Sequence, residues 1–184
     1  MKKLFLLTAV AGLFACSNVS AQNVTGPKLG IGADFAVPIG SLSDGYKFGI
    51  GGSLLFQTPI TTKLNFTASA GYLNFIGKND VQYVSLSENG FNIVSGKNPN
   101  AGVIPVKVGV RYFIGDSFYA GGEVGAAFIT GDGSTTAFAY SPNIGFELPV
   151  ANKNTIDLGI KYEGWSKESS VGFFGFRVAY NFGL

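Results

Sequence analysis

Residues 174–184 end the chain with the run Phe-Gly-Phe-Arg-Val-Ala-Tyr-Asn-Phe-Gly-Leu. Successive side chains of a β-strand point to opposite faces, so this run separates large apolar residues from small and polar ones. One face would carry Phe174, Phe176, Val178, Tyr180, Phe182 and Leu184, and the other Gly175, Arg177, Ala179, Asn181 and Gly183. The first face suits hydrocarbon and the second a polar interior. If earlier segments repeat the pattern, a closed barrel is predicted, because hydrocarbon does not tolerate open sheet edges.

The same alternation recurs in seven earlier segments. They cover residues 27–37, 46–57, 63–73, 103–113, 118–129, 137–148 and 155–163. Alternating segments of roughly 10 residues, separated by turn residues, are typical of transmembrane barrels. We therefore predict an all-β fold, an eight-stranded antiparallel up-and-down transmembrane β-barrel.

Aromatic residues on the outward faces gather at the strand ends, with Tyr46 and Phe56 as examples at the two ends of one segment. Two aromatic girdles at the membrane interfaces predict this distribution. The alternative explanation is β-propensity, which enriches aromatic residues in any strand. Propensity does not sort residues by depth, so the girdles are favoured.

The N-terminus has the features of a secretory signal peptide. Lys2 and Lys3 precede an apolar run over residues 4–15, and small residues lead to Ala21. This pattern predicts cleavage between Ala21 and Gln22, with a signal peptide over 1–21 and a barrel domain over 22–184. The apolar run is too short for a membrane-spanning helix, which needs about 20 residues. Cys16 is either discarded with the signal or, in a lipoprotein-like cleavage context, lipidated.

Composition excludes several function classes. The chain has 13 basic and 11 acidic residues, and loss of Lys2 and Lys3 would leave 11 of each, which argues against nucleic-acid binding. Aromatic residues reach 14% against 13% charged residues, a balance that favours a membrane-exposed exterior. The chain contains no histidine and only one cysteine, so histidine- or cysteine-dependent catalysis and ordinary zinc sites are not expected. We expect no enzyme, no cofactor and no metal.

Two glycine-rich stretches and one acidic turn resemble ligand-binding loops only superficially. Residues 49–53 and 121–125 lie within predicted strands and open no helix, unlike phosphate loops. Asp132 lies in a glycine-rich turn without the spaced acidic ligands of a calcium loop. Trp165, near the end of a predicted strand, is interpreted as an interfacial anchor, with ligand stacking as the alternative.

Charged residues fall on the predicted inward faces with nearly balanced signs. The residues expected to form a polar lumen network are Lys107, Arg111, Glu123, Glu147, Asp157, Lys161, Glu163 and Arg177, and the same faces carry Lys28, Asp34 and Lys47. Isolated buried charges are costly, so mutual pairing is expected. Inward glycines would make room, since about eight strands enclose an interior that side chains just fill. A selective ion path is the alternative interpretation.

The predicted connections alternate in length. Short turns are expected near 58–62, 114–117 and 149–154, on the periplasmic side. Longer connections, near 38–45, 74–102, 130–136 and 164–170, are expected on the outer side. The longest, 74–102, contains strand-like stretches at 81–86 and 91–94, followed by turn residues.

Several stretches resemble the outer membrane β-barrel protein family, the small OmpA-like and OmpX-like barrels of the porin family in the form common among Bacteroidota. They are Val37-Pro38-Ile39-Gly40 with residues 45–49, the run 104–113, the run 118–125 and the aromatic C-terminal strand. The resemblance implies a Gram-negative outer membrane location and contact with its lipid. It also implies that the barrel-assembly machinery reads the last strand, here through Gly175, Val178, Tyr180 and Phe182. The usual terminal aromatic is displaced, because Gly183 and Leu184 follow Phe182.

The sequence is compatible with three function hypotheses. The first is a structural or surface-interaction protein with a filled lumen, which presents the loop 74–102 to an extracellular partner. The second is a small porin-like conduit for ions or solutes. The third is a soluble lipocalin-like barrel or a lipidated barrel; in the lipocalin-like form the two faces would exchange roles.

Overall fold

The structure, a computed structural model, describes residues 26–79, 81–87, 90–96, 98–130, 134–151, 153–167 and 170–184. The side chains of 81–95 and of Ala151 are not described. The expected signal peptide over 1–21, its cleavage point between Ala21 and Gln22, Cys16 and Asp132 all lie outside the described residues.

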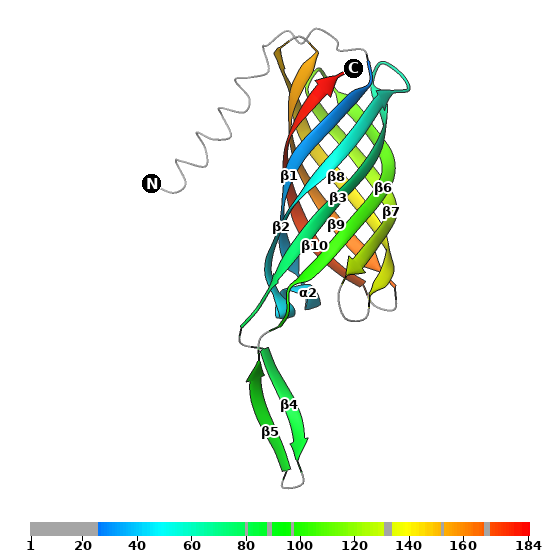
Figure 1. Cartoon of the computed structure of the whole chain (residues 1–184). Coiled ribbons are helices and arrows are strands. Elements are labelled where there is room, and N and C mark those ends of the chain that lie inside the picture. Colours follow the sequence, from blue (N-terminus) through cyan, green and yellow to red (C-terminus); the bar gives the residue numbers. More distant parts are fainter. Residues whose placement is uncertain are drawn as a thin grey trace.

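Eight long strands form a closed antiparallel barrel, which confirms the predicted fold class (Figure 1). Neighbours in the wall follow the order β1-β10-β9-β8-β7-β6-β3-β2, and β10 pairs with β1 to close it. The strands are β1 (Lys28–Ile39), β2 (Tyr46–Pro59), β3 (Leu64–Gly77), β6 (Ala101–Ile114), β7 (Phe118–Thr130), β8 (Thr135–Ala151), β9 (Asn154–Ser166) and β10 (Ser170–Gly183).

Most strands extend beyond their predicted bounds, chiefly toward the end with the longer connections. β3 continues to Gly77 rather than residue 73, and β10 begins at Ser170. The alternation of side chains continues through these extensions, but the residues that point inward there are apolar, as Phe75 and Phe173 are. The pattern of apolar-out and polar-in residues therefore ends before the strand does.

The two ends of the barrel differ in their connections. At one end lie the C-terminus and three short connections, 60–63, 115–117 and 152–153. In the connection 115–117, Gly115 has a φ of 76°, a left-handed conformation that favours glycine. The other end carries the short helix α2 (Ser41–Gly45) and a separate hairpin of β4 (Val81–Ser87) and β5 (Gly90–Gly96). The expected loop 74–102 is thus shorter, 78–100, because its first and last residues belong to β3 and β6.

The hairpin projects away from the barrel along the direction of the strands (Figure 1). β4 and β5 pair with each other in a regular antiparallel register, from Val81 opposite Gly96 to Ser87 opposite Gly90. Seven residues at about 3.3 Å each give the paired segment a length of about 23 Å. It forms a two-stranded sheet separate from the barrel wall.

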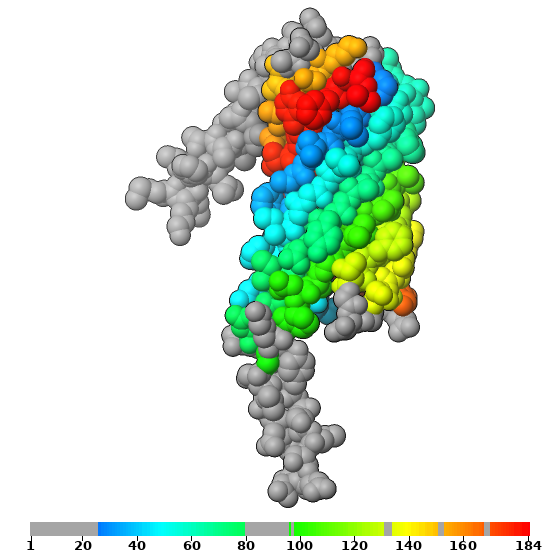
Figure 2. All heavy atoms as spheres, viewed as in Figure 1, coloured from blue at the N-terminus to red at the C-terminus, as the bar shows by residue number. Residues whose placement is uncertain are grey.

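Large apolar side chains cover the outside of the barrel. Ile31, Leu54, Val108 and Val178 lie near the middle of their strands and are about half exposed. Aromatic residues lie mainly toward the two ends, where their rings contact each other, as in Tyr162 with Phe174 at one end and Phe118 with Phe146 at the other. The face visible in Figure 2 is a continuous surface of oblique strands. Among the described residues, no helix is both long and apolar enough to span a membrane.

The start of β2 departs from the predicted alternation. A register irregularity between Tyr46 and Phe48 leaves Lys47 exposed, and the Tyr46 ring packs against Phe75 at a centroid distance of 6.0 Å. The predictions that Tyr46 faces outward and Lys47 inward are therefore wrong. A bulge adds one residue to a strand, so the residues beyond it exchange faces.

Candidate functional site

The structure places all eight residues of the expected lumen network inside the barrel. Lys107, Arg111, Glu123, Glu147, Asp157 and Glu163 are buried, while Lys161 and Arg177 are partly buried. Lys28 and Asp34 join them, so five basic and five acidic side chains take part in the described ion pairs. Equal numbers of opposite charges keep the interior free of a net charge that would be costly to bury.

Asp157 of β9 is the centre of one cluster. Its Oδ2 accepts hydrogen bonds from Nη1 of Arg111 at 2.7 Å and from Nη1 of Arg177 at 3.0 Å. Its Oδ1 accepts one from the Tyr119 hydroxyl at 2.7 Å. The Arg111 guanidinium carbon also lies 4.2 Å from the Tyr119 ring centroid, a cation–π geometry. One fully buried carboxylate thus holds three side chains from β6, β7 and β10.

Glu163, six residues further along β9, is the centre of a second cluster. Its Oε2 lies 2.6 Å from Lys107 Nζ and 3.1 Å from Lys161 Nζ. Lys107 also pairs with Glu123 at 3.5 Å, and Lys161 with Asp34 at 3.6 Å. Asp157 and Glu163 share the inward face of one strand, because residues separated by an even number point the same way.

A third pair, Lys28 with Glu147, lies toward the end with the short turns. The Glu147 carboxylate also accepts hydrogen bonds from Gln57 at 3.1 Å and Thr155 at 2.9 Å. Gln57 in turn accepts from Arg111 at 3.3 Å, which links this pair to the Asp157 cluster. The network therefore runs along the barrel interior instead of forming isolated pairs.

Inward glycines make space for the long side chains, as expected. A Cβ atom at Gly175 would lie 2.7 Å from Cε of Lys161, whose chain crosses that position. A Cβ atom at Gly159 would lie 2.9 Å from the Tyr119 hydroxyl. The absence of side chains at these positions is what allows the ion pairs to reach across a narrow barrel.

The lumen has a second, apolar part near the hairpin end. We call it the apolar plug; its buried members are Ala36, Leu73, Phe75, Val103, Ala127, Ala137, Ala139, Trp165 and Phe173. The rings of Phe75, Trp165 and Phe173 meet edge to face at centroid distances of 5.2–5.7 Å. Leu42 of α2 packs against it. The plug packs the lumen at the end where the inward-facing residues are apolar.

Trp165 belongs to this plug, so its interpretation as an interfacial anchor is wrong. It is only 3% exposed, and its indole Nε1 donates a hydrogen bond to Oε1 of Glu163 at 2.9 Å. The alternation itself carried the signal, because Trp165 has the same parity as Asp157 and Glu163. The parity of Trp165 along β9, rather than its place near the strand end, therefore determines which way its side chain points.

The base of the hairpin is tied to the barrel by hydrogen bonds. The Gly45 carbonyl at the end of α2 accepts from the Lys78 backbone at 2.9 Å and from Asn98 Nδ2 at 3.1 Å. The Asn98 backbone donates to the Lys78 carbonyl at 2.9 Å, and Asn100 Oδ1 accepts from the Gly77 backbone at 3.1 Å. These contacts fix both strands of the hairpin base to the rim, a function of Asn98 and Asn100 that the sequence did not reveal.

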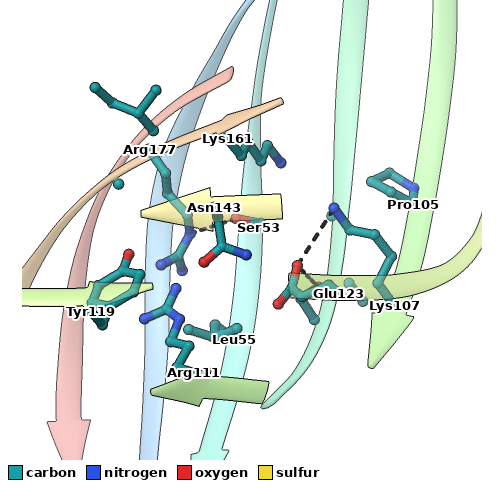
Figure 3. Close-up of a pocket in the computed structure, with 15 residues that line it drawn as sticks. Ser53, Leu55, Pro105, Lys107, Arg111, Tyr119, Glu123, Asn143, Lys161 and Arg177 are labelled. Carbon is teal, nitrogen blue, oxygen red and sulfur yellow. Dashed lines mark hydrogen bonds and ion pairs between the residues drawn. The ribbon is translucent and has the colours of Figure 1, made fainter. Parts of the chain in front are cut away.

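The interactions of the described lumen side chains are ion pairs, hydrogen bonds and apolar packing. Among the described residues no set of three histidine, cysteine, aspartate or glutamate side chains could hold a metal ion. The polar part of the lumen contains a partly open cavity of about 50 Å³ (Figure 3). Apolar packing and paired charges therefore occupy much of the lumen that the structure describes.

A comparison with protein families finds a match over residues 6–182 to the model described as outer membrane protein beta-barrel domain. A search of curated proteins finds no match. Several solved structures are similar across most of their length. At 12–19% identity these likenesses concern the fold alone.

One similar structure is Ail, the attachment invasion locus protein of Yersinia pestis, solved in complex with the heparin analogue sucrose octasulfate. The two sequences are 19% identical and the TM-score is 0.51. The match covers 85% of this chain and 99% of that chain. A second is Neisserial surface protein A, with 14% identity, a TM-score of 0.56 and coverage of 86% and 97%. A third is OprG from Pseudomonas aeruginosa, with 12% identity, a TM-score of 0.54 and coverage of 87% and 97%.

Proposed function

Since the chain belongs to the outer membrane protein β-barrel domain family, we propose that it is a surface-interaction protein of the Gram-negative outer membrane, which binds an extracellular partner through the hairpin β4–β5. The observation that carries the proposal is the hairpin itself, which extends beyond the barrel at the end opposite the C-terminus. We infer that this end faces outward and that the end with the short turns faces the periplasm, as expected for an exported chain that crosses the membrane an even number of times.

The filled lumen supports this role. The apolar plug and the paired charges occupy the interior, so the barrel serves as a rigid base that holds the hairpin away from the membrane surface. The bonds of Gly45 with Lys78 and Asn98 keep that base connected to the hairpin. Binding residues are often carried on such segments, positioned by a rigid scaffold.

We infer that the partner is a protein rather than a sulfated glycan, although Ail was solved with a heparin analogue. Residues 81–96 contain Glu88 as their single charged residue, and the wider segment 78–100 has two lysines against Asp80 and Glu88. A polyanion would need an excess of basic residues for binding. A segment with so few charges suits backbone and apolar contacts instead.

The proposed role includes no catalysis. The chain contains no histidine, and its single cysteine, Cys16, precedes the barrel. Ser–His and Cys–His nucleophile–base pairs cannot be assembled from what remains. The proposed domain limits stay 1–21 for the signal peptide and 22–184 for the barrel.

The test compares cells that display the complete chain with cells that display a variant in which residues 80–97 are replaced by a short Gly-Ser turn. Equal heat-modifiable migration on gels would show that both barrels fold. We expect only the complete chain to support adhesion to immobilised extracellular protein, with heparin-coated wells as a parallel surface. Equal adhesion by both chains would contradict the proposal, and adhesion to heparin alone would contradict the choice of a protein partner.

We also propose that the barrel-assembly machinery reads the last strand through Val178, Tyr180 and Phe182, with Gly175 on its inward face. Phe182 is 46% exposed on the outside of β10, two residues from the end of the chain. Phe182→Ala is expected to lower the amount of folded protein in outer membrane fractions. Phe174→Ala, the matched control near the other end of the same strand, is expected to assemble normally. An equal loss in both variants would contradict the assignment.

A further inference from the structure

The seam between β8 and β9 contains a proline that interrupts its hydrogen bonding. The register of β8 with β7 is continuous through Pro142, whereas the register with β9 stops at Tyr140 and resumes at Asn143. Proline has no N–H group, so Pro142 cannot donate a hydrogen bond to the ladder. The Asn143 side chain donates to the Ser141 carbonyl at 3.1 Å, within its own strand rather than across the seam. The seam is therefore weaker here than an unbroken ladder.

Few contacts join β8 and β9 between this point and the hairpin end of the barrel. Three residue pairs lie there: Tyr140 with Gly164, Ala139 with Trp165, and Phe138 with Ser166. Among the described residues, one further hydrogen bond joins the two strand ends, from Lys167 to Thr135, and it is exposed. The chain adds no link at this end, because the short turn 152–153 connects the two strands at the opposite end. The outer ends of β8 and β9 can therefore separate while the rest of the barrel stays intact.

The seam between β3 and β6 has a similar proline but is tied at its outer end. Its register lacks two pairs beside Pro105. There, however, the hairpin connects the outer ends of the two strands, and Asn100 Oδ1 accepts a hydrogen bond from the Gly77 backbone at the hairpin base. Of the two interrupted seams, the one between β8 and β9 is thus the one whose ends are free to part.

The outward faces of β8 and β9 become polar at this end. Thr136 and Ser166 lie on the same outward faces as Ile144 and Ile160, which are nearer the middle of their strands. Hydrocarbon does not tolerate an unpaired strand edge, whereas water can bind the backbone groups that separation would release. The outer ends of these strands therefore have a surrounding in which they can part.

The plug and the polar lumen lie behind the seam. Ala139 and Trp165, which face each other across it, are both members of the apolar plug. Next to them, Ser141 is only 1% exposed, and its hydroxyl has no hydrogen-bond partner within the described part of the chain. Asn143, two residues further, lines the cavity of about 50 Å³ (Figure 3). Separation of the strands would open a path past the plug to this cavity.

From these observations we propose that the outer ends of β8 and β9 form a gate, closed in this structure, which admits water and small polar solutes to the charged lumen. Tyr140 is its latch, because its ring lies across the seam over Gly164, where a Cβ atom would collide with it. The ion pair of Lys107 with Glu163 helps to hold the wall together below the gate. The proposal does not rest on adhesion through the hairpin, which is no part of the gate.

The test measures how fast a buried thiol beside the gate is labelled. Ser141→Cys is made in a chain that carries Cys16→Ser, so position 141 holds the only thiol. A water-soluble methanethiosulfonate reagent is added to the folded barrel in lipid vesicles. Because the rate follows the population of the open gate, Tyr140→Ala should raise it about tenfold and Pro142→Val, which restores a ladder donor, should lower it about tenfold.

Matched controls make the same two changes at the other seam. Tyr72→Ala removes a ring that lies over Gly102, and Pro105→Val restores a donor facing β3. Neither variant should change the labelling rate at position 141. If they change it as much as the variants of β8 do, the opening is not specific to β8 and β9, and the proposal is overturned.

A disulfide across the gate provides a further test. Phe138→Cys with Ser166→Cys, a directly opposed pair, should stop the labelling of position 141 when oxidised and restore it when reduced. Unchanged labelling in the oxidised form would overturn the proposal. If Ser141→Cys does not fold, hydrogen exchange of the parent decides: amides of residues 138–140 should exchange faster than those of 126–128 in the unbroken part of β7. Equal exchange in both segments would reject the gate.

Discussion

Trp165 donates its indole N–H to Oε1 of Glu163 at 2.9 Å, and both residues point into the barrel from β9. This bond joins the two parts of the lumen. The Trp165 ring belongs to the apolar plug, whereas the other oxygen of Glu163 pairs with Lys107 and Lys161. The aromatic plug and the charged network are therefore one connected interior, and four predictions follow from its geometry.

The fluorescence of Trp165, the only tryptophan in the chain, should be insensitive to quenchers in the lipid phase, because its ring lies inside the barrel. In vesicles containing brominated lipids, the parent protein is expected to keep nearly all of its emission. The double variant Trp165→Phe with Phe174→Trp places the fluorophore on the outer face, where strong quenching is expected. Strong quenching of the parent would show that Trp165 faces lipid after all.

Glu163→Gln should lower the free energy of unfolding by about 3 kcal/mol, since removing one partner of a buried ion pair leaves the remaining charges uncompensated. Here two lysines, Lys107 and Lys161, lose their shared carboxylate. Equilibrium urea unfolding in lipid vesicles measures the change. Lys47→Gln is the control, expected to stay within about 0.5 kcal/mol as an exposed substitution. If Glu163→Gln changes the free energy of unfolding as little as Lys47→Gln does, the ion-pair network does not contribute to the stability of the barrel.

Adjacent glycines in β7 should respond in opposite ways to alanine. A Cβ atom at Gly121 would point inward and lie 2.5 Å from the Val110 carbonyl oxygen and 3.2 Å from Arg111 Cγ, whereas at Gly122 it would meet nothing within 4 Å. Gly121→Ala is expected to cost about 1–3 kcal/mol through overpacking. Gly122→Ala should be neutral or slightly stabilising, because alanine lowers the entropy of the unfolded chain. The same unfolding assay separates them, and equal effects would contradict the assigned faces.

The purified barrel should show no steady open channel in planar lipid bilayers, because the plug and the ion pairs fill its interior. The measurement decides between the surface-interaction role and the small porin-like conduit. Single-channel recordings at two salt concentrations test this. We expect only rare and small current steps, similar to those of empty bilayers. Large and reproducible steps that scale with salt concentration would favour the conduit.

The sequence determined the barrel by itself, because the signal for it is local. Each strand repeats an alternation of two residues, and eight such segments with apolar outer faces leave closure as the solution in a membrane. The same alternation placed Lys107, Asp157 and Arg177 on inward faces. The hairpin strands also agree with the strand-like stretches within the longest connection.

Only the tertiary structure decided which residues of strands distant in the sequence contact one another. The register irregularity between Tyr46 and Phe48 exchanges the faces of Tyr46 and Lys47, and no local sequence pattern predicts it. Asp157, Arg111 and Arg177 meet only because the barrel closes and brings β6, β9 and β10 around one narrow interior. The plug around Trp165 arises in the same way, since inward apolar residues at the strand ends become a packed core only when the strands face each other across the barrel.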